Sequence, residues 1–282
     1  MPLNRACVGR TYPGVVSTAT REAIESYARA CNENDPRYLD STVAGGIVAP
    51  PMFAVVATWI PLLGALTDPE LKADLLRLLH TGQEMEFLAP LRPGDQITAA
   101  ATLAAIADAR GGESLTVDLS AANQSGAPVS RTRFTALIRG RRTPDPRPAT
   151  RLLPRVAPLA VVTQTIDHDQ TFRYAEASGD RNPIHVDDNV AKLAGLPGII
   201  VHGLCTMAFA GRALVEQVCG GDPLRLRRLA VNFARPVFPG DAITTTIWDA
   251  EHGVDGFRAF SFETVNAEGL VVIRDGSALI LP

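Results

Sequence analysis

An acid and an imidazole lie five residues apart in one short stretch of the C-terminal half. The stretch reads Tyr174-Ala-Glu-Ala-Ser-Gly-Asp180-Arg-Asn-Pro-Ile-His185, and a second glycine-containing pair, His202-Gly203, follows it. A carboxylate and an imidazole can share one water molecule and move its proton, and the turn at Asn-Pro would bring the two side chains together. The pattern therefore indicates acid–base chemistry rather than packing.

The composition of the chain excludes several classes of function. Of the 282 residues, 46% are apolar and 20% are charged, which is typical of a globular protein with an ample core. A formal net charge of −3 offers no electrostatic attraction for nucleic acid or for an anionic membrane. We therefore expect neither as a partner, and a small molecule fits better.

The cysteines and the termini indicate a cytoplasmic protein. The four cysteines form no Cys-x-x-Cys pair and accompany no histidine cluster, so we expect neither disulfides nor a metal site. The N-terminus lacks an uninterrupted hydrophobic segment, and the C-terminus carries no recognised address. Residues 47–63 are apolar enough to mimic a membrane span, but three prolines break the run and favour a buried core helix.

The two halves of the chain are related by an internal duplication. Tyr27–Tyr38 aligns with Tyr174–His185 at a shift of 147 residues (174 − 27), and Phe87–Asp95 aligns with Phe233–Asp241. The segment between the halves is rich in proline and charge, which is typical of an extended linker. We predict two domains, residues 1–140 and 158–282, joined by a linker at 141–157.

Each half shows the same order of elements, with helices before strands. A capped helix begins after Thr20 in one half and after Asp169 in the other, and a strongly apolar helix follows, around 52–60 and 204–218. The rest of each half reads as strands separated by glycine turns. The predicted strands are 96–106, 115–122, 129–139, 227–233, 242–249, 257–265 and 270–281. This order predicts an α+β fold, with one apolar helix against a curved antiparallel sheet.

Residues 174–191 and the pair His202-Gly203 resemble the MaoC-like, hydratase 2 family of (R)-specific enoyl-CoA hydratases and 3-hydroxyacyl-thioester dehydratases. The family pattern is a Tyr, then Ser-Gly-Asp-x-Asn-Pro-aliphatic-His, then five residues and an Ala, and it is met at every position up to Ala191. The resemblance implies a tandem double hotdog, a role in fatty-acid or other lipid metabolism, and no cofactor. It also implies trans-2-enoyl thioester substrates, carried on CoA or on an acyl carrier protein.

Hydration of such a thioester needs a base that activates water, an acid that protonates Cα, and a group that stabilises charge on the thioester oxygen. We expect Asp180 and His185 to hold the water, and the residues leave open which of them is the base. The N–H of Gly203, at the start of the apolar helix, is the predicted oxyanion donor. Asn182 and Ser178 are assigned to substrate binding or loop orientation. His202 is assigned to substrate binding, with packing or helix capping as its alternative role.

The N-terminal half departs from the pattern at the residues that matter for chemistry. Glu33 replaces the acid, Tyr38 replaces the imidazole, and Pro50-Pro51 replaces the histidine–glycine pair. The oxyanion donor is lost there because proline has no N–H. We therefore predict a catalytically silent half that houses the acyl chain, with Met52 and Val56 among the residues that bind it.

Several other residues fit plainer roles. We expect structural or solvent-exposed positions for the remaining histidines, a buried position for Cys205, and helix capping rather than metal binding for the run at 167–169. A basic group at 225–228 contacts a carrier phosphate or forms a solvated strand face. The histidines are His80, His168 and His252.

Two alternative functions and one question of assembly stay open. Hotdog domains also support thioesterases, in which water attacks the carbonyl carbon, and the chain could be a non-catalytic acyl-thioester binder or a partner subunit. An exposed sheet edge on a double hotdog would favour a homodimer.

Overall fold

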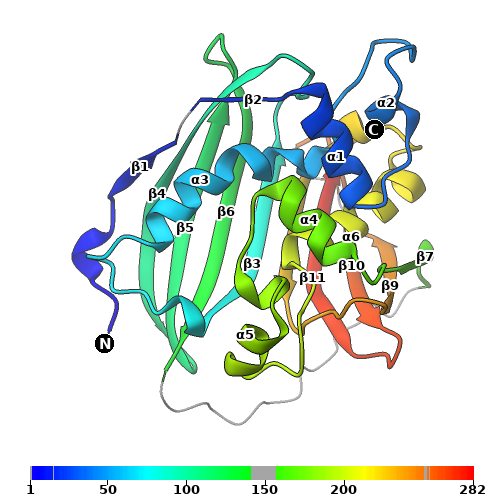
Figure 1. Ribbon diagram of the computed structural model, residues 1–282. Coiled ribbons are helices and arrows are strands. Elements are labelled where there is room, and N and C mark those ends of the chain that lie inside the picture. Colours follow the sequence, from blue (N-terminus) through cyan, green and yellow to red (C-terminus); the bar gives the residue numbers. More distant parts are fainter. Residues whose placement is uncertain (1, 15, 141–156, 251–252, 254) are drawn as a thin grey trace.

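The computed structural model describes residues 2–14, 16–140, 157–250, 253 and 255–282. These residues form an antiparallel sheet of 11 strands with the helices on one of its faces, so the α+β prediction is confirmed (Figure 1). The predicted linker lies outside the described residues, except for residue 157.

The first half contributes six strands and three α-helices. In chain order its elements are η1 (Arg5–Cys7), β1 (Thr11–Pro13), β2 (Ser17–Thr18), α1 (Arg21–Ala30), α2 (Pro36–Leu39), η2 (Pro51–Phe53), α3 (Ala54–Leu66), η3 (Leu75–Arg77), β3 (Leu78–Phe87), β4 (Gln96–Ala109), β5 (Gly112–Ala122) and β6 (Pro128–Arg139). Thr20 caps α1, because its side chain accepts a hydrogen bond from the N–H of Ala23.

The second half repeats this order with five strands. Its elements are β7 (Ala160–Thr165), α4 (Gln170–Ser178), η4 (Pro183–His185), α5 (Asp188–Leu193), α6 (Gly203–Val218), η5 (Pro223–Arg225), β8 (Leu226–Phe233), β9 (Ala242–Asp249), β10 (Arg258–Asn266) and β11 (Val271–Ile280). Asp169 precedes α4 as expected, but its side chain forms no capping hydrogen bond.

The strand order shows how the two halves meet. The sheet runs β1-β4-β5-β6-β3-β8-β11-β10-β9-β7, so the order β4-β5-β6-β3 is mirrored by β9-β10-β11-β8. The central pair β3–β8 is antiparallel and sets Gly82 opposite Asn232 and Met85 opposite Leu229. Backbone hydrogen bonds therefore join the halves into one continuous sheet.

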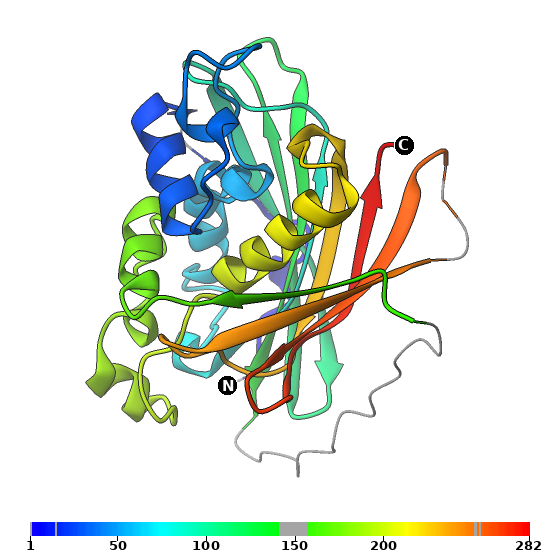
Figure 2. The same cartoon turned by 90° about the vertical axis from the view of Figure 1, so that its right-hand side faces the viewer.

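The helical layer covers one face of this curved sheet (Figure 2). The apolar helices α3 and α6 lie closest to the strands, and one core cluster contains side chains from both, such as Phe209 and Val55. Helices α1 and α4 meet where the halves join, and the hydroxyl oxygens of Tyr27 and Tyr174 lie 3.4 Å apart. The duplicated tyrosines thus form a buried pair between the two halves.

Two features differ from the sequence-based expectation. Strands β1, β2, β3 and β7 were not predicted, and β1, β2 and β7 precede the helices of their halves rather than following them. Pro61 was expected to break the apolar run, but it lies inside α3. One lost hydrogen bond is tolerated there because Pro61 and its neighbour Leu62 are buried, which compensates the loss.

No helix within the described residues is long and apolar enough to cross a bilayer.

Candidate active site

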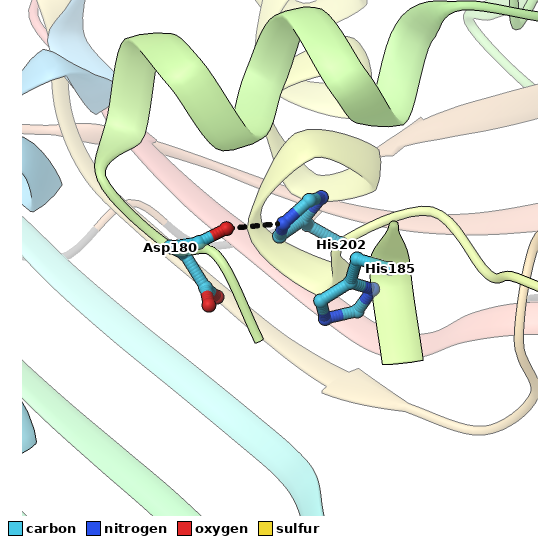
Figure 3. Close-up of side chains that lie close together, drawn as sticks. All are labelled: Asp180, His185 and His202. Carbon is cyan, nitrogen blue, oxygen red and sulfur yellow. Dashed lines mark hydrogen bonds between the residues drawn. The ribbon is translucent and has the colours of Figure 1, made fainter. Parts of the chain in front are cut away.

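The structure brings the predicted acid and imidazole together. Asp180 follows the end of α4, His185 ends η4, and Gly203 is the first residue of α6. One side-chain ligand atom from each of Asp180, His185 and His202 lies within 4.8 Å of the others, and Figure 3 shows the three side chains grouped side by side. Two loops that are 22 residues apart in sequence thus meet at one site.

Local hydrogen bonds fix the loop that carries Asp180. Gly179 ends α4 in the left-handed region (φ 82°), which favours glycine. The Ser178 hydroxyl donates to the backbone oxygen of Tyr174 (2.7 Å) and accepts from the N–H of Asp180 (3.2 Å). The N–H of Asn182 donates to the Asp180 carboxylate at 3.1 Å. Ser178 and Asn182 are therefore engaged in shaping the loop.

The protonation of His185 follows from its surroundings. Its Nδ1 lies 2.8 Å from the backbone oxygen of Ile200, and because a carbonyl only accepts, Nδ1 carries the hydrogen. The side chain is 7% exposed, and burial lowers its pKa to about 4. At neutral pH the ring is therefore uncharged, and Nε2 presents a lone pair.

The pKa of Asp180 is shifted upward, whereas that of His185 is shifted downward. Burial raises its pKa to about 6, and the hydrogen bond from the N–H of Asn182 opposes this rise. At neutral pH the carboxylate is mostly ionised, so the site presents two acceptors, a carboxylate and Nε2 of His185. A water with two hydrogen bonds of about 2.8 Å at a near-tetrahedral angle spans about 4.6 Å. That span fits atoms within 4.8 Å of one another.

His202 supports both of these residues. Its Nε2 donates to the backbone oxygen of Asp180 at 2.9 Å, which leaves Nδ1 of the neutral ring as an acceptor. The Thr171 hydroxyl lies 3.2 Å from this Nδ1, and its one hydrogen also faces the backbone oxygens of His185 (3.0 Å) and Ile200 (3.3 Å). The ring also stacks on that of His185, with centroids 3.8 Å apart. Both ring nitrogens are thus engaged within the protein. This geometry favours a supporting role for His202 over the predicted substrate contact.

Gly203 occupies its position for a reason that sequence alone does not reveal. A Cβ atom on this residue would lie 3.2 Å from two ring carbons of Phe233, so a larger side chain would press on that ring. Its N–H is one of the first-turn donors of α6, which have no partner inside the helix. The N-terminus of the helix therefore leaves this N–H without a partner inside the helix, as the predicted role of oxyanion donor requires.

Asp180, His185 and His202 lie close enough together to be considered as ligands of one metal ion. Whether they fit a metal depends on which of their lone pairs are free. Nε2 of His202 is occupied as a donor to Asp180, and Nδ1 is covered by the Thr171 hydroxyl at 3.2 Å. Only the carboxylate and Nε2 of His185 remain free, whereas a zinc site commonly takes three or four protein ligands. The donor set does not fit a metal without breaking these hydrogen bonds.

Residues of the first half lie against this site. A Cβ on Gly179 would lie 3.3 Å from Cδ1 of Trp59 on α3. His80 on β3 packs its ring 4.7 Å from that of Phe233, and its Nε2 donates to the backbone oxygen of Gly82 at 3.1 Å. Burial, opposed by its hydrogen bonds and assisted by the proximity of His185, lowers the pKa of His80 to about 4. His80 therefore takes one of the two roles expected for it, a structural position.

Thr171, Phe233 and Trp59 are the residues that sequence reasoning missed at this site. No motif marks them, because each acts through a contact between elements that are distant in the chain. Their only sequence signal is position: Phe233 has a counterpart, Phe87, in the duplication.

Met52 does not join Asp180 and His185 but lines a small cavity elsewhere, and Val56 packs half-buried on the core.

The predictions for the cysteines, the basic group at 225–228 and the other histidines have different outcomes. All four cysteines are free and buried, as expected for Cys205. The basic group at 225–228 is engaged within the protein: Arg225 and Arg227 donate to backbone oxygens, and Arg228 pairs with Glu84 at 2.8 Å. The ring of His168 lies against Gly240. His252 lies outside the described residues.

Comparisons with known proteins assign the two halves separately. Residues 153–268 match a family model described as MaoC like domain, and residues 6–132 match one described as FAS1-like, dehydratase domain region. The chain is 36% identical over 208 residues to 3-hydroxyacyl-thioester dehydratase Y of Mycobacterium tuberculosis, covering 71% of each chain. It is 31% identical to probable enoyl-CoA hydratase 2 of Dictyostelium discoideum, covering 74% of this chain and 72% of the relative.

Solved structures agree with the fold. A MaoC-like dehydratase from Phytophthora capsici superposes with a TM-score of 0.81 at 26% identity, covering 99% of this chain and 98% of the other. A Mycobacterium tuberculosis protein described as having a double hotdog fold superposes with a TM-score of 0.66 at 13% identity, covering 96% and 95%. The chain therefore has a double hotdog fold and belongs to the MaoC-like dehydratase family.

Proposed function

We propose that the protein is a hydro-lyase that reversibly hydrates trans-2-enoyl thioesters to (R)-3-hydroxyacyl thioesters. One observation carries this proposal: a carboxylate oxygen of Asp180 and a ring nitrogen of His185 lie within 4.8 Å of each other, close enough for one water to bridge the two residues. The names of the two relatives above, a 3-hydroxyacyl-thioester dehydratase and an enoyl-CoA hydratase 2, support the same reaction class.

The protonation states suggest a sequence of steps. Because Asp180 and His185 both accept, the water donates one hydrogen to each and turns a lone pair toward Cβ of the substrate. Attack at Cβ transfers a water proton to one of the two groups and moves charge onto the thioester oxygen. The N–H of Gly203 and the positive end of α6 stabilise that charge. The group that took the proton returns it to Cα, so the hydroxyl group at Cβ and the hydrogen at Cα both come from the water.

The two halves take different roles in this proposal. Residues 158–282 form the catalytic domain, whose motif lies on α4, η4 and α6. Residues 1–140 form a catalytically silent domain, since Tyr38 and Pro51 supply neither an imidazole nor an N–H at the corresponding positions. We assign this domain to structural support and acyl-chain binding, in which Met52 and Val56 take part.

The setting of the reaction is also proposed. Four free cysteines fit a reducing compartment such as the cytoplasm, where an acyl-CoA or acyl-carrier-protein thioester of lipid metabolism would be the substrate. Within the described residues, β7 pairs only with β9 and so ends the sheet, and its free edge suits a homodimer.

Crotonyl-CoA tests the function in one assay. We expect the enoyl absorbance to fall without release of free thiol, and chiral analysis to show the (R)-3-hydroxy product. Release of free thiol from crotonyl-CoA without hydration of its double bond would instead identify a thioesterase. No change with crotonyl-CoA or with longer enoyl thioesters on either carrier would favour a non-catalytic binder and overturn the proposal.

A further inference from the structure

Strand β3 contains a β-bulge at Thr81. His80 lies opposite Ala136 of β6, but Gly82 lies opposite Thr135, so Thr81 is an extra residue without a partner on β6. Because side chains alternate between the two faces of a strand, the extra residue turns His80 onto the face that Ala136 occupies. Ala136 packs in a core cluster with residues of α3, so this is the face that the helices cover. The bulge thus directs His80 toward the helical layer.

The imidazole of His80 links the two halves of the chain. Its centroid lies 4.3 Å from that of Phe134 on β6 and 4.7 Å from that of Phe233 on β8. Its Nε2 donates to the backbone oxygen of Gly82 at 3.1 Å, and Oε1 of Gln83 lies 3.2 Å from the same nitrogen. The ring is thus packed against one aromatic ring from each half and tied to its own strand, which holds it in one orientation.

Phe233 extends this contact to the helix that begins at Gly203. A Cβ atom on Gly203 would lie 3.2 Å from two carbons of the Phe233 ring, so one edge of that ring lies against the first residue of α6. Glycine has no side chain that could pack and hold this turn, and the Phe233 ring packs there instead. His80 also lies close enough to His185 for that imidazole to contribute to its lowered pKa. His80, Phe233 and Gly203 therefore form a line of contacts from the first half to the active site.

We propose that His80 is a positioning residue for the hydration reaction. From the first half, it holds Phe233 against the start of α6 and thereby keeps the N–H of Gly203 directed at the thioester oxygen. His80 takes no part in proton transfer and acts through Phe233. This inference rests on the proposed function and deepens it, because the half that lacks the catalytic motif then influences the rate of the reaction.

The size of the effect follows from the role of the N–H. One oxyanion donor contributes about 100-fold or more to kcat, and a hydrogen bond weakens steeply as its angle closes. Loss of the packing behind Phe233 lets the ring and the first turn of α6 shift, but it does not remove the donor. The loss in kcat should therefore be smaller than that, about ten-fold.

Steady-state kinetics with crotonyl-CoA tests this role. His80→Ala removes the ring behind Phe233 and should lower kcat about ten-fold with little change in KM, since the donor acts on charge that develops in the transition state. His80→Phe keeps a flat ring at the same place and should restore most of the rate. Leu79→Ala is the matched control: Leu79 precedes His80 on β3 and is 40% exposed, so its truncation should leave kcat unchanged.

A double-mutant cycle with Gly203 distinguishes positioning of the donor from general support of the fold. Gly203→Pro lacks the N–H, so the addition of His80→Ala should cost little more in kcat. Gly203→Ala also carries a Cβ against Phe233 but keeps the N–H, so His80→Ala should still lower kcat clearly in that background. Thermal unfolding shows whether each variant is folded, and His80→Leu takes the place of His80→Ala if the latter is not.

Three results would each overturn the role of His80. They are an unchanged kcat in His80→Ala, a His80→Phe variant as slow as His80→Ala, and losses that multiply in the Gly203→Pro background. The parent protein separates these results from the proposed function. A parent that hydrates no enoyl thioester overturns both proposals, whereas an active parent with multiplying losses overturns only the role of His80.

Discussion

The ring of His202 stacks on that of His185, with centroids 3.8 Å apart and an interplanar angle of 25°. At the same time its Nε2 donates to the backbone oxygen of Asp180, as the dashed line in Figure 3 shows. One buried ring therefore sets the position of both groups that are proposed to hold the water. The residue that the sequence offered as a substrate contact is better explained as the support of the site.

His202→Ala should lower kcat much more than it raises KM. Loss of the stack and of the hydrogen bond to Asp180 lets the two groups drift, and a misplacement of about 1 Å costs on the order of 100-fold in rate. Thr171→Val, which removes the hydroxyl that lies against Nδ1 and against the backbone oxygens of His185 and Ile200, should cause a smaller loss, and Thr171→Ser should cause little. Steady-state kinetics with crotonyl-CoA provides the test. A rise in KM with unchanged kcat for His202→Ala would restore the substrate-binding assignment.

The pH dependence of kcat/KM should report the ionisation of Asp180. Burial raises its pKa to about 6, and the carboxylate must be ionised to accept a proton from water. The pKa of His185, lowered to about 4, keeps that ring neutral over the same range. Activity should therefore fall as the pH drops through about 6, and rate profiles in the free-enzyme limit measure it. A profile that stays flat down to about pH 5 would contradict this assignment.

Asp180→Asn should stabilise the fold while it removes activity. The folded-state pKa of about 6 exceeds the ordinary value of 3.8, so the folded state disfavours the charged form. The sign follows: the penalty is fully present above about pH 6, declines as the pH falls from about 6 to 4, and is absent below both values. At neutral pH the variant should gain about 2 kcal/mol in free energy of unfolding, measured by urea denaturation. An equal gain at about pH 3 would show that another cause is at work.

Gly203→Pro and Gly203→Ala separate the backbone donor from the packing of the residue. Both variants place a Cβ against Phe233, but only proline removes the N–H. Proline is tolerated at the first helical position, and the backbone of His202 (φ −57°, ψ 136°) is allowed before a proline. The proline variant should be slower than the alanine variant by about 100-fold, the typical loss of one oxyanion donor. Equal rates would show that this N–H does not stabilise the oxyanion.

Several features of the site could be predicted because they reside in contiguous sequence. The spacing of Asp180, Asn182 and His185 encodes a local turn, and Thr20 caps its helix through a bond to the N–H of Ala23, three residues away. The duplication also indicated correctly that the halves share an order of helices and strands. In each case the partners lie within a few residues, or the pattern itself repeats.

Other features depend on contacts that no local pattern contains. Strand β3 carries the polar run His80-Thr-Gly-Gln-Glu84, and its central place between β6 and β8 turns that run into a strand. The same pairing brings His80 to Phe233, and Phe233 in turn explains the glycine at the start of α6. Thr171 reaches His202 across 31 residues. These relationships come from the assembled sheet and helices rather than from spacing.

A double-mutant cycle on Asp180→Asn and His185→Ala tests the central claim most directly. If the two side chains act as one unit around one water, each single variant should lose about 1000-fold or more in kcat for crotonyl-CoA hydration. The double variant should then lose little more than the slower single variant, because removal of either group already dismantles the unit. Losses that multiply in the double variant, or substantial activity in any of the three, would contradict the account.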